Sequence, residues 1–597
     1  MAANQELKSR YEEERIKRLR AEGVGQFTNL EGVIDPEHQD PFKEVEDRAP
    51  VYDDVEFTFV GGGWAGLMTG ARLKEAGINV RYVEKAGGFG GVWYWNRYPG
   101  LMCDTSSLIY LPFLEETKYT PTEFYAHGPE ILEHANRIAK QYDLGENSLF
   151  HTRVTEVEWS EDKKRWIVRT ARGDEFTTKF LALGLGALHV AKLPNFPGIE
   201  DFKGDWFHTS RWDYSVTGGS ATEPMDKLKD KRVAVIGTGA TSVQIVPELG
   251  RDAKELLVFQ RTPTAVSARD NGPLHYDWLE EMQSEPGWQE KLYNHFLEWF
   301  EDWRFGSGIL NEEHTPNWIN DAWTNTGELV AGYLKEYKPK NKEEARKALY
   351  AADEELSGKV RARVDGIVKD EKTAEMLKAW YPFWCKRPGY HDEYLPTFNR
   401  DNVHLVDTDG KGVERITEKG IVANGKEYEV DVIIYATGFQ YNRDLSRVPG
   451  VKIIGRDGLA LDDFWEEGLQ TLHGFQVNGY PNLFLQQSIQ AAYLASNVPQ
   501  NYIYASKAIR DLVSKARENG YETIEPTKDA QDKWVQFLEE NSSPNDDPEC
   551  TPGYYNNEGK APGKREQRSV GYPYGPTAFF KYFENWREEG YDGLQFA

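Results

Sequence analysis

The sequence predicts an α/β protein with two Rossmann-like dinucleotide-binding domains and a helical insertion. Three observations indicate this fold. Two segments, near residues 60 and 236, follow the order apolar strand, glycine turn, helix and second strand. Between roughly 265 and 378 the composition changes to charged, helix-favouring segments that are rich in tryptophan. A chain of 597 residues is long enough for several such units.

The first 49 residues are predicted to form an extension that contains one helix, from Gln5 to Glu22. A weak apolar stripe along this helix is formed by Leu7, Tyr11, Ile16 and Leu19. We therefore expect the helix to pack on the main body. The charges of this segment leave no apolar core for a signal peptide, and no apolar run approaches the roughly 20 residues of a membrane-spanning helix. These features predict a cytoplasmic protein.

The first βαβ unit is VEFTFVGGGWAGLMTGARLKEAGINVRYVEK. Gly61, Gly63 and Gly66 form GxGxxG directly after the apolar strand, where they allow a tight turn, a close approach to a pyrophosphate and helix–strand packing. Glu84 ends the next strand, where a carboxylate can accept hydrogen bonds from an adenosine ribose and disfavours a 2′-phosphate. The unit predicts FAD binding. The alternative is a glycine-rich turn with a surface glutamate.

The second unit, KRVAVIGTGATSVQIVPELGRDAKELLVFQRTP, repeats this order. Gly237 and Gly239 keep the first two glycines, but Ser242 stands at the third position. The second strand ends in Arg261 and Thr262, whose guanidinium and hydroxyl groups suit a 2′-phosphate ester. This unit predicts NADPH binding. The alternative is that Arg261 is a solvated charge at the end of a strand.

Two different dinucleotide sites predict hydride transfer from NADPH to a flavin, followed by an electron acceptor such as O₂. The three cysteines, Cys103, Cys385 and Cys550, are too few for a disulfide framework, and none lies in a CxxC pair. This excludes the flavoprotein reductases that use a dithiol.

The predicted domain bounds follow from these cofactors. We expect an N-terminal extension at 1–49, the FAD-binding domain at 50–186 and 439–597 with the C-terminal tail, the NADPH-binding domain at 187–264 and 379–438, and the helical insert at 265–378.

The net charge of −26 repels nucleic acid and anionic membrane surfaces, and no basic patch in the sequence offsets it. We therefore expect neither as a partner. A neutral, lipophilic small molecule fits better, and no metal site is predicted.

Two long motifs carry a resemblance to a known family. FKGDWFHTSRWD, between the two units, matches FxGxxxHxxxW(P/D) at Phe202, Gly204, His208 and Trp212. A second pattern, (A/G)GxWxxxx(F/Y)P(G/M)xxxD, is complete at Gly91, Trp93, Tyr98, Pro99, Gly100 and Asp104. By these motifs the chain resembles the type I Baeyer–Villiger monooxygenases, in the branch with an N-terminal extension that acts on larger ketones.

The resemblance implies roles for particular residues. Arg387 would be the active-site arginine, Asp104 its partner, and Lys386 a further ligand of the NADPH phosphate. The residues implied around FAD are Val92, Trp93, Asp104, Tyr110 and Val154. Those implied around the NADPH pyrophosphate are Thr238, Gly239, Ala240, Thr241, Ser242 and Gln244.

The resemblance also implies the reaction, in which NADPH and O₂ form a C4a-peroxyflavin that converts a ketone into an ester or lactone. We expect bulky, cyclic or long-chain ketones. A fixed guanidinium at Arg387 would stabilise the peroxide and the oxyanion of the adduct, while Asp104 orients it. The alternative for Arg387 is a purely structural salt bridge to Asp104.

His208 and Trp212 are interpreted as linker residues that couple the two domains, because the reaction needs no further general base. The tryptophan-rich insert is expected to be mostly core, with part of it lining an apolar pocket. Two other functions stay open at this point. One is an N- or S-oxygenating monooxygenase, and the other is a silent nucleotide-binding redox sensor. The oligomeric state, monomer or small oligomer, also stays open.

Overall fold

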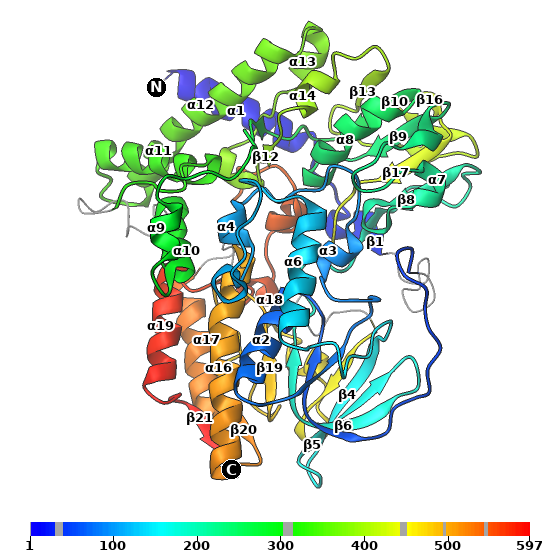
Figure 1. The fold of residues 1–597 in the computed structure, drawn as a ribbon. Helices are drawn as coiled ribbons and strands as arrows, with labels where there is room; N and C mark the ends of the chain where they lie inside the picture. The colour runs from blue at the N-terminus through cyan, green and yellow to red at the C-terminus, as the bar shows by residue number, and fades with distance from the viewer. Residues whose placement is uncertain (1, 30–39, 302–314, 442–449, 493–496, 543–546) are drawn as a thin grey trace.

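The computed structural model describes residues 2–29, 40–301, 315–441, 450–492, 497–542 and 547–597. Its architecture confirms the predicted fold class. Two separate sheets, each with a glycine turn and a following helix, stand one above the other, and a group of helices lies along one side of both (Figure 1).

The first sheet has the strand order β18-β4-β5-β6-β2-β3, with β19 paired to β6. Its strands are β2 (Asp54–Val60), β3 (Val80–Val83), β4 (Val154–Ser160), β5 (Arg165–Thr170), β6 (Glu175–Leu183), β18 (Lys452–Ile454) and β19 (Leu483–Leu485). β2 runs parallel to β3 and β6, with Phe57 opposite both Val80 and Phe180. Helix α2 (Trp64–Glu75) follows β2 after the glycine turn and packs against α16 (Val498–Asn519).

The second sheet is parallel throughout, in the order β13-β10-β9-β17-β8. Its strands are β8 (Asp205–His208), β9 (Arg232–Ile236), β10 (Glu255–Gln260), β13 (Val403–Asp407) and β17 (Val432–Tyr435). β9, β10 and β17 are continuous apolar runs, as expected of strands that are covered on both faces. Helix α8 (Ala240–Asp252) follows β9, and a small antiparallel sheet of β14 (Arg415–Ile416), β15 (Gly420–Ala423) and β16 (Lys426–Glu429) lies at the edge.

Each sheet draws its strands from two separated parts of the chain. The first sheet uses 54–183 and 452–485, and the second uses 205–260 and 403–435. These ranges fall inside the domain bounds predicted from the sequence, which remain a prediction. The chain thus leaves each domain and returns to it.

The insert consists of α9 (Leu279–Gln283), α10 (Trp288–Phe300), α11 (Ala322–Tyr337), α12 (Lys342–Ile367) and α13 (Glu371–Leu377). Residues 302–314 of the insert lie outside the described part of the chain. Local capping explains two helix starts. The carboxylate of Asp321 accepts a hydrogen bond from the Thr324 amide at 2.8 Å, and Asn341 does the same for Glu344 at 2.9 Å. Trp288, Trp299 and Trp323 are buried, as expected for a mostly structural insert.

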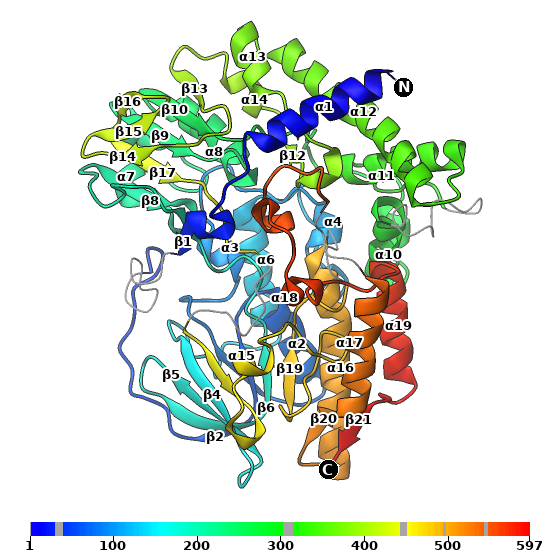
Figure 2. The same ribbon diagram turned by 180° about the vertical axis from the view of Figure 1, so that it is seen from behind.

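The N-terminal helix α1 spans Ala2–Ile16 and lies along α12 (Figure 2). The hydroxyl of Tyr11 donates to the Asp353 carboxylate at 2.7 Å. The predicted end at Glu22 is wrong, because the helix ends at Ile16. Ile16 is 58% exposed and Leu19 is 40% exposed, so the apolar stripe stops after Tyr11. Beyond the helix the chain forms η1 (Gly23–Gln26) and β1 (Phe27–Asn29), which pairs with β7 (Lys192–Pro194).

The C-terminal part forms α16, α17 (Lys528–Asn541) and α19 (Pro576–Glu588), which pack together beside the first sheet (Figures 1 and 2). A disulfide joins Cys385 to Cys550 across 165 residues. It anchors the stretch Cys550–Lys560, called here the tail segment, which contains η9 (Tyr554–Gly559) and lies against η1.

The described chain also has shorter α-helices and β-strands. They are α3 (Val92–Trp95), α4 (Ser107–Tyr110), α5 (Leu114–Thr117), α6 (Gly128–Gln141), α7 (Tyr214–Thr217), α14 (Tyr394–Thr397), α15 (Leu461–Phe464), α18 (Lys564–Gln567), β11 (Val266–Ser267), β12 (Gly389–Tyr390), β20 (Ile524–Pro526) and β21 (Leu594–Phe596).

Candidate active site

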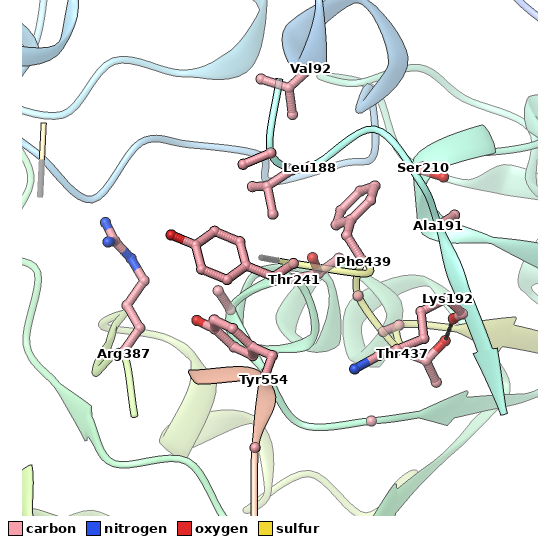
Figure 3. Close-up of a pocket in the computed structure, with 18 of the residues that line it drawn as sticks. Val92, Leu188, Ala191, Lys192, Ser210, Thr241, Arg387, Thr437, Phe439 and Tyr554 are labelled. Carbon is pink, nitrogen blue, oxygen red and sulfur yellow. Dashed lines mark hydrogen bonds between the residues drawn. The ribbon is translucent and has the colours of Figure 1, made fainter. Parts of the chain in front are cut away.

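A single cavity of about 2340 Å³ lies where the two sheets, the insert and the tail segment meet. Both glycine turns open into it. Arg387 extends into this space, and the amino group of Lys192 points into it from another wall (Figure 3). The cavity therefore brings together residues from all parts of the chain that the sequence assigned to the site.

The first glycine turn, Gly61–Gly66, has no room for side chains at two of its glycines. Gly61 has a φ of +112°, and a Cβ there would lie 2.4 Å from the carbonyl oxygen of Gly184. A Cβ on Gly66 would lie 2.3 Å from the carbonyl oxygen of Gly61. Gly61 and Gly63 line the cavity, and Gly66 lies behind them at the start of α2. A turn of this shape at the N-terminus of a helix fits a pyrophosphate.

Glu84 is placed at the end of β3, beside this turn, and lines the cavity. Its carboxylate accepts a hydrogen bond from the Ala86 amide at 2.7 Å and another from the Gly62 amide. Burial raises the pKa of Glu84, and these two amides counteract the rise. A carboxylate can accept further bonds on its remaining lone pairs, which fits the hydroxyls of an adenosine ribose.

The second glycine turn, Gly237–Ser242, has a serine at the position where the first turn has its third glycine. Gly237 has a φ of +116°, and a Cβ there would lie 2.4 Å from the carbonyl oxygen of Ala436. Ser242 is fully buried, and its hydroxyl donates to the carbonyl oxygen of Gly237 at 2.6 Å. The hydroxymethyl group is thus accommodated by a hydrogen bond across the turn. Thr238 also ties the turn to the end of β10, because its hydroxyl donates to the carbonyl oxygen of Thr262 at 2.6 Å.

The other residues assigned to NADPH lie on the cavity wall. These are Thr238, Gly239, Ala240, Thr241, Gln244, Arg261, Thr262 and Lys386, whereas Ser242 lies behind the turn. The side chain of Gln244 is also engaged by protein. It accepts a hydrogen bond from the Met102 amide at 2.6 Å and donates to the Ala240 carbonyl at 3.1 Å. Gln244 therefore connects the second glycine turn to the loop that carries Asp104.

The residues assigned to the flavin surround the first turn. Val92, Trp93, Tyr110 and Val154 all line the cavity. The indole nitrogen of Trp93 donates to the Tyr110 hydroxyl at 2.7 Å, and burial raises the pKa of Tyr110, so its hydroxyl stays protonated. This wall is aromatic and apolar, as a flavin ring requires.

Arg387 and Asp104 form a bidentate pair on the cavity wall. The Nη2 atom of Arg387 lies 2.5 Å from one carboxylate oxygen and its Nε lies 3.1 Å from the other. The Trp323 ring lies 4.7 Å from the Arg387 guanidinium, and the Trp323 indole donates to the main-chain carbonyl of Asp104 at 2.7 Å. Burial would lower the pKa of Arg387, but the adjacent Asp104 raises it well above the usual value. The guanidinium is thus a permanent, oriented positive charge.

Sequence reasoning missed a second arginine beside this pair. Arg269 is 6% exposed, and two of its nitrogens have no hydrogen-bond partner in the described part of the chain. Burial lowers the pKa of Arg269, while Asp104 and Cys103 counteract this. No motif surrounds Arg269 in the sequence, so its proximity to Asp104 is visible only in the fold.

The linker motif lies at the edge of the cavity, which Ser210 and Arg211 line. His208 and Trp212 are completely buried and do not line the cavity. The Nδ1 atom of His208 accepts a hydrogen bond from the Ser210 amide at 3.1 Å, and burial lowers the pKa of His208 to about 3, so the ring is neutral. A Cβ on Gly204 would lie 2.5 Å from the carbonyl oxygen of Asp431. These contacts favour the interpretation of a domain linker, which stays a prediction.

Trp212 also brings the two sequence motifs together. Its ring packs edge-on against Phe207 with centroids 5.1 Å apart, and it lies 6.5 Å from the ring of Tyr98 in the second motif. Phe202 is buried in the core of the second sheet. The motif residues thus hold the linker against the loop that leads to Asp104.

Comparisons with known proteins identify the family of this chain. Residues 56–305 match the family model described as flavin-binding monooxygenase-like. The chain is 42% identical to Baeyer–Villiger monooxygenase 4 of Dietzia sp., over 99% of this chain and 95% of that protein. Its structure is similar to the polycyclic ketone monooxygenase from the thermophilic fungus Thermothelomyces thermophila, with 36% identity, a TM-score of 0.89 and coverage of 99% of both chains.

A second solved structure adds the cofactors. The complex of OTEMO with FAD and NADP has 28% sequence identity and a TM-score of 0.71, covering 92% of this chain and 100% of that chain.

Among the described helices of the present chain, none has the length and apolar character needed to span a bilayer.

Proposed function

The chain belongs to the Baeyer–Villiger monooxygenases, and from this we propose that it converts bulky, cyclic or long-chain ketones into esters or lactones with Arg387 and Asp104 as its catalytic pair. It is an NADPH-dependent FAD monooxygenase. One atom of O₂ enters between the carbonyl carbon and its neighbour, and the other leaves as water with the two electrons of NADPH.

The observation that carries the site assignment is the bidentate pair of Arg387 and Asp104 in a cavity shared by both glycine turns. Reduced FAD supplies the activated oxygen when both cofactors are bound. The Arg387 guanidinium can donate to the substrate oxygen as negative charge develops on it during attack at the carbonyl carbon. Asp104 keeps that guanidinium in one orientation, and the guanidinium keeps its positive charge at any pH the enzyme meets.

The proposed cofactor ligands follow from the two turns. For FAD they are Gly61, Gly63, Gly66, Glu84, Val92, Trp93, Asp104, Tyr110 and Val154. For NADPH they are Thr238, Gly239, Ala240, Thr241, Ser242, Gln244, Arg261, Thr262 and Lys386. The steric limits at Gly61 and Gly237 support the tight turns that both assignments require, and Gly239 lines the cavity with nothing within 4 Å of a Cβ, where a phosphate can approach the backbone.

The size class of the substrate is supported by the walls of the cavity. Phe300, Trp323 and Tyr390 give it an apolar side next to Arg387. The similarity to a polycyclic ketone monooxygenase points the same way. A panel of ketones from cyclohexanone to fused-ring ketones tests the size class, which is wrong if the small ketones are turned over best.

The catalytic pair is tested by Arg387→Ala. We expect ester formation to fall at least about 100-fold, as when an oxyanion donor is removed, while NADPH still reduces the bound flavin. Lys359→Ala is the matched control, because Lys359 also lines the cavity but is paired with Glu355 at an exposed position. Ester formation at the wild-type rate in Arg387→Ala would show that the assigned role is wrong.

A further inference from the structure

A cluster of cations surrounds one carboxylate next to the second glycine turn. Its members, called here the cation cluster, are Lys192, Arg261 and Lys386, and the carboxylate is that of Glu558 in the tail segment. All four line the cavity. Arg261 follows the last residue of β10, which is where the ribose 2′ position of a bound dinucleotide lies in this fold.

Glu558 is buried without being tightly bonded. Its side chain is 4% exposed, yet its oxygens lie 3.7 Å from Lys192 Nζ and 3.7 Å from Arg261 Nη2. Its Oε2 atom has no hydrogen-bond partner in the described part of the chain. A close buried ion pair of this protein looks different, since Arg18 and Glu14 approach to 2.6 Å. Glu558 partly neutralises Lys192 and Arg261 without a close hydrogen bond to either. It lies in a space where a larger anion can come closer to both cations.

The cluster carries more positive charge than Glu558 can balance. Arg20 of the N-terminal extension adds to it and acts electrostatically on Arg261, whereas the charge of the nearby Arg18 is balanced by Glu14 at 2.6 Å. Burial lowers the pKa of Lys386 to about 7, against the effect of Glu558 and together with the repulsion of Arg261, Arg18 and Lys192. An additional negative charge at this position would therefore be stabilised.

The N-terminal extension closes the cluster from outside. Arg18 donates from Nε to the Thr262 hydroxyl at 3.0 Å and to the Arg261 carbonyl at 3.1 Å. The ring of Phe27 lies 4.0 Å from Lys192 Nζ and 5.9 Å from the Arg261 guanidinium. The cations thus lie in a walled pocket between the extension and the tail segment.

We propose that Glu558 holds the place of the 2′-phosphate of NADPH before the cofactor binds and leaves it on binding, so that this carboxylate sets how strongly the enzyme distinguishes NADPH from NADH. The inference rests on the proposed function, in which the second glycine turn binds NADPH. Two anions cannot share this buried site without strong repulsion. A 2′-hydroxyl, by contrast, can donate to the carboxylate, so Glu558 is compatible with NADH and works against the phosphate.

The test is calorimetric titration of the oxidised, FAD-loaded full-length enzyme with NADP⁺ and with NAD⁺. For Glu558→Gln we expect NADP⁺ to bind about tenfold more tightly, which corresponds to about 1.4 kcal/mol. NAD⁺ should bind equally or more weakly. Glu549→Gln is the matched control, because it removes the same charge nine residues earlier in the chain. Glu549 pairs with Arg346 and does not line the cavity. Glu558→Asp, which keeps the charge, should retain the wild-type ratio of the two affinities.

A second readout does not depend on the dinucleotide. Inorganic phosphate should raise the melting temperature of Glu558→Gln more than that of the wild type, relative to sodium chloride at equal ionic strength. The inference is wrong if Glu558→Gln has the wild-type ratio of NADP⁺ to NAD⁺ affinity, or a lower one. Arg261→Ala distinguishes a failure of the NADPH assignment from a failure of the role proposed for Glu558. If this variant keeps the wild-type ratio, the NADPH assignment itself fails. If it loses the ratio and Glu558→Gln does not change it, the role of Glu558 alone fails.

Discussion

The indole nitrogen of Trp323 lies 2.7 Å from the main-chain carbonyl oxygen of Asp104 and donates a hydrogen bond to it. Trp323 belongs to the first turn of α11, in the helical insert, whereas Asp104 belongs to the loop between α3 and α4. The ring of the same tryptophan lies beneath the guanidinium of Arg387. The insert therefore supports the proposed catalytic pair.

Trp323→Phe removes this hydrogen bond and keeps an aromatic ring. We expect the main chain at Asp104 to become more mobile, so that Asp104 orients Arg387 less well. Less ketone should then be converted per NADPH, and more hydrogen peroxide should be released. The rate of ester formation should fall about tenfold, the effect typical of losing a residue that orients a catalytic group. Product and peroxide are measured in the same reaction. Trp278→Phe is the control, because Trp278 stacks on Tyr276 within the insert and does not line the cavity. An unchanged ratio of ester to peroxide would contradict the prediction.

The third positions of the two glycine turns should respond differently to a methyl group. Gly66→Ala places a Cβ 2.3 Å from a main-chain oxygen, so we expect purified protein that has lost most of its FAD. Ser242→Ala removes one hydrogen bond, a cost of about 1 kcal/mol, and should keep its affinity for NADP⁺ within a few fold. Flavin absorbance per protein measures the first effect, and titration measures the second. Gly358→Ala, in open space within α12, is the neutral control. Full flavin content in Gly66→Ala would overturn the steric argument.

The affinity for NADP⁺ should depend on pH through Lys386. Burial lowers the pKa of this ammonium group to about 7, so it loses its charge as the pH rises through that value. A bound phosphate dianion favours the charged form, so binding takes up a proton above pH 7. We expect affinity to fall between pH 7 and pH 9, by at most about tenfold per pH unit for one proton. NAD⁺ affinity should fall less, and Lys386→Arg should flatten the profile because arginine stays charged. Equal slopes for the two nucleotides would exclude this role.

The disulfide between Cys385 and Cys550 should stabilise the tail segment. Cys550→Ser opens a link across 165 residues, and the loss of such a bond typically costs about 2–4 kcal/mol. Limited proteolysis should then cleave the tail segment faster than in the wild type. A reductant should abolish the difference between the two proteins. A wild type that is as sensitive as the variant without reductant would show that the bond does not form.

Much of the fold follows from local patterns in the sequence. The turns at Gly61 and Gly237 are predictable because an apolar strand, a glycine that can adopt a positive φ and the start of a helix follow one another within a few residues. The end of α1 was not predictable. Its charges continue to Glu22, but Arg18 also bonds to Thr262 at the end of β10, 244 residues away, and this partner is invisible in the local pattern.

The site was predictable where a motif exists and not elsewhere. Arg387 and Asp104 lie 283 residues apart, and their pairing was expected from family resemblance alone. Arg269 and Glu558 carry no motif, and their importance comes from burial without close partners, which depends on segments folded against them. A tail glutamate surrounded by basic residues from three other parts of the chain cannot be found by spacing.

The hydrogen bond from the Met102 amide to Gln244 has a mechanical consequence. It spans the two dinucleotide-binding halves, since Met102 precedes the Asp104 loop and Gln244 lies on α8. Any swing of one half relative to the other must break it, and one such bond is worth about 1 kcal/mol. Alone it is a weak contact, but it is one of several that join the halves, together with the hydrogen bond from the Tyr214 hydroxyl to the Arg97 carbonyl and the pair of Arg387 and Asp104. A displacement of one half costs the sum of these contacts, and their positions define where the second half returns over the flavin half.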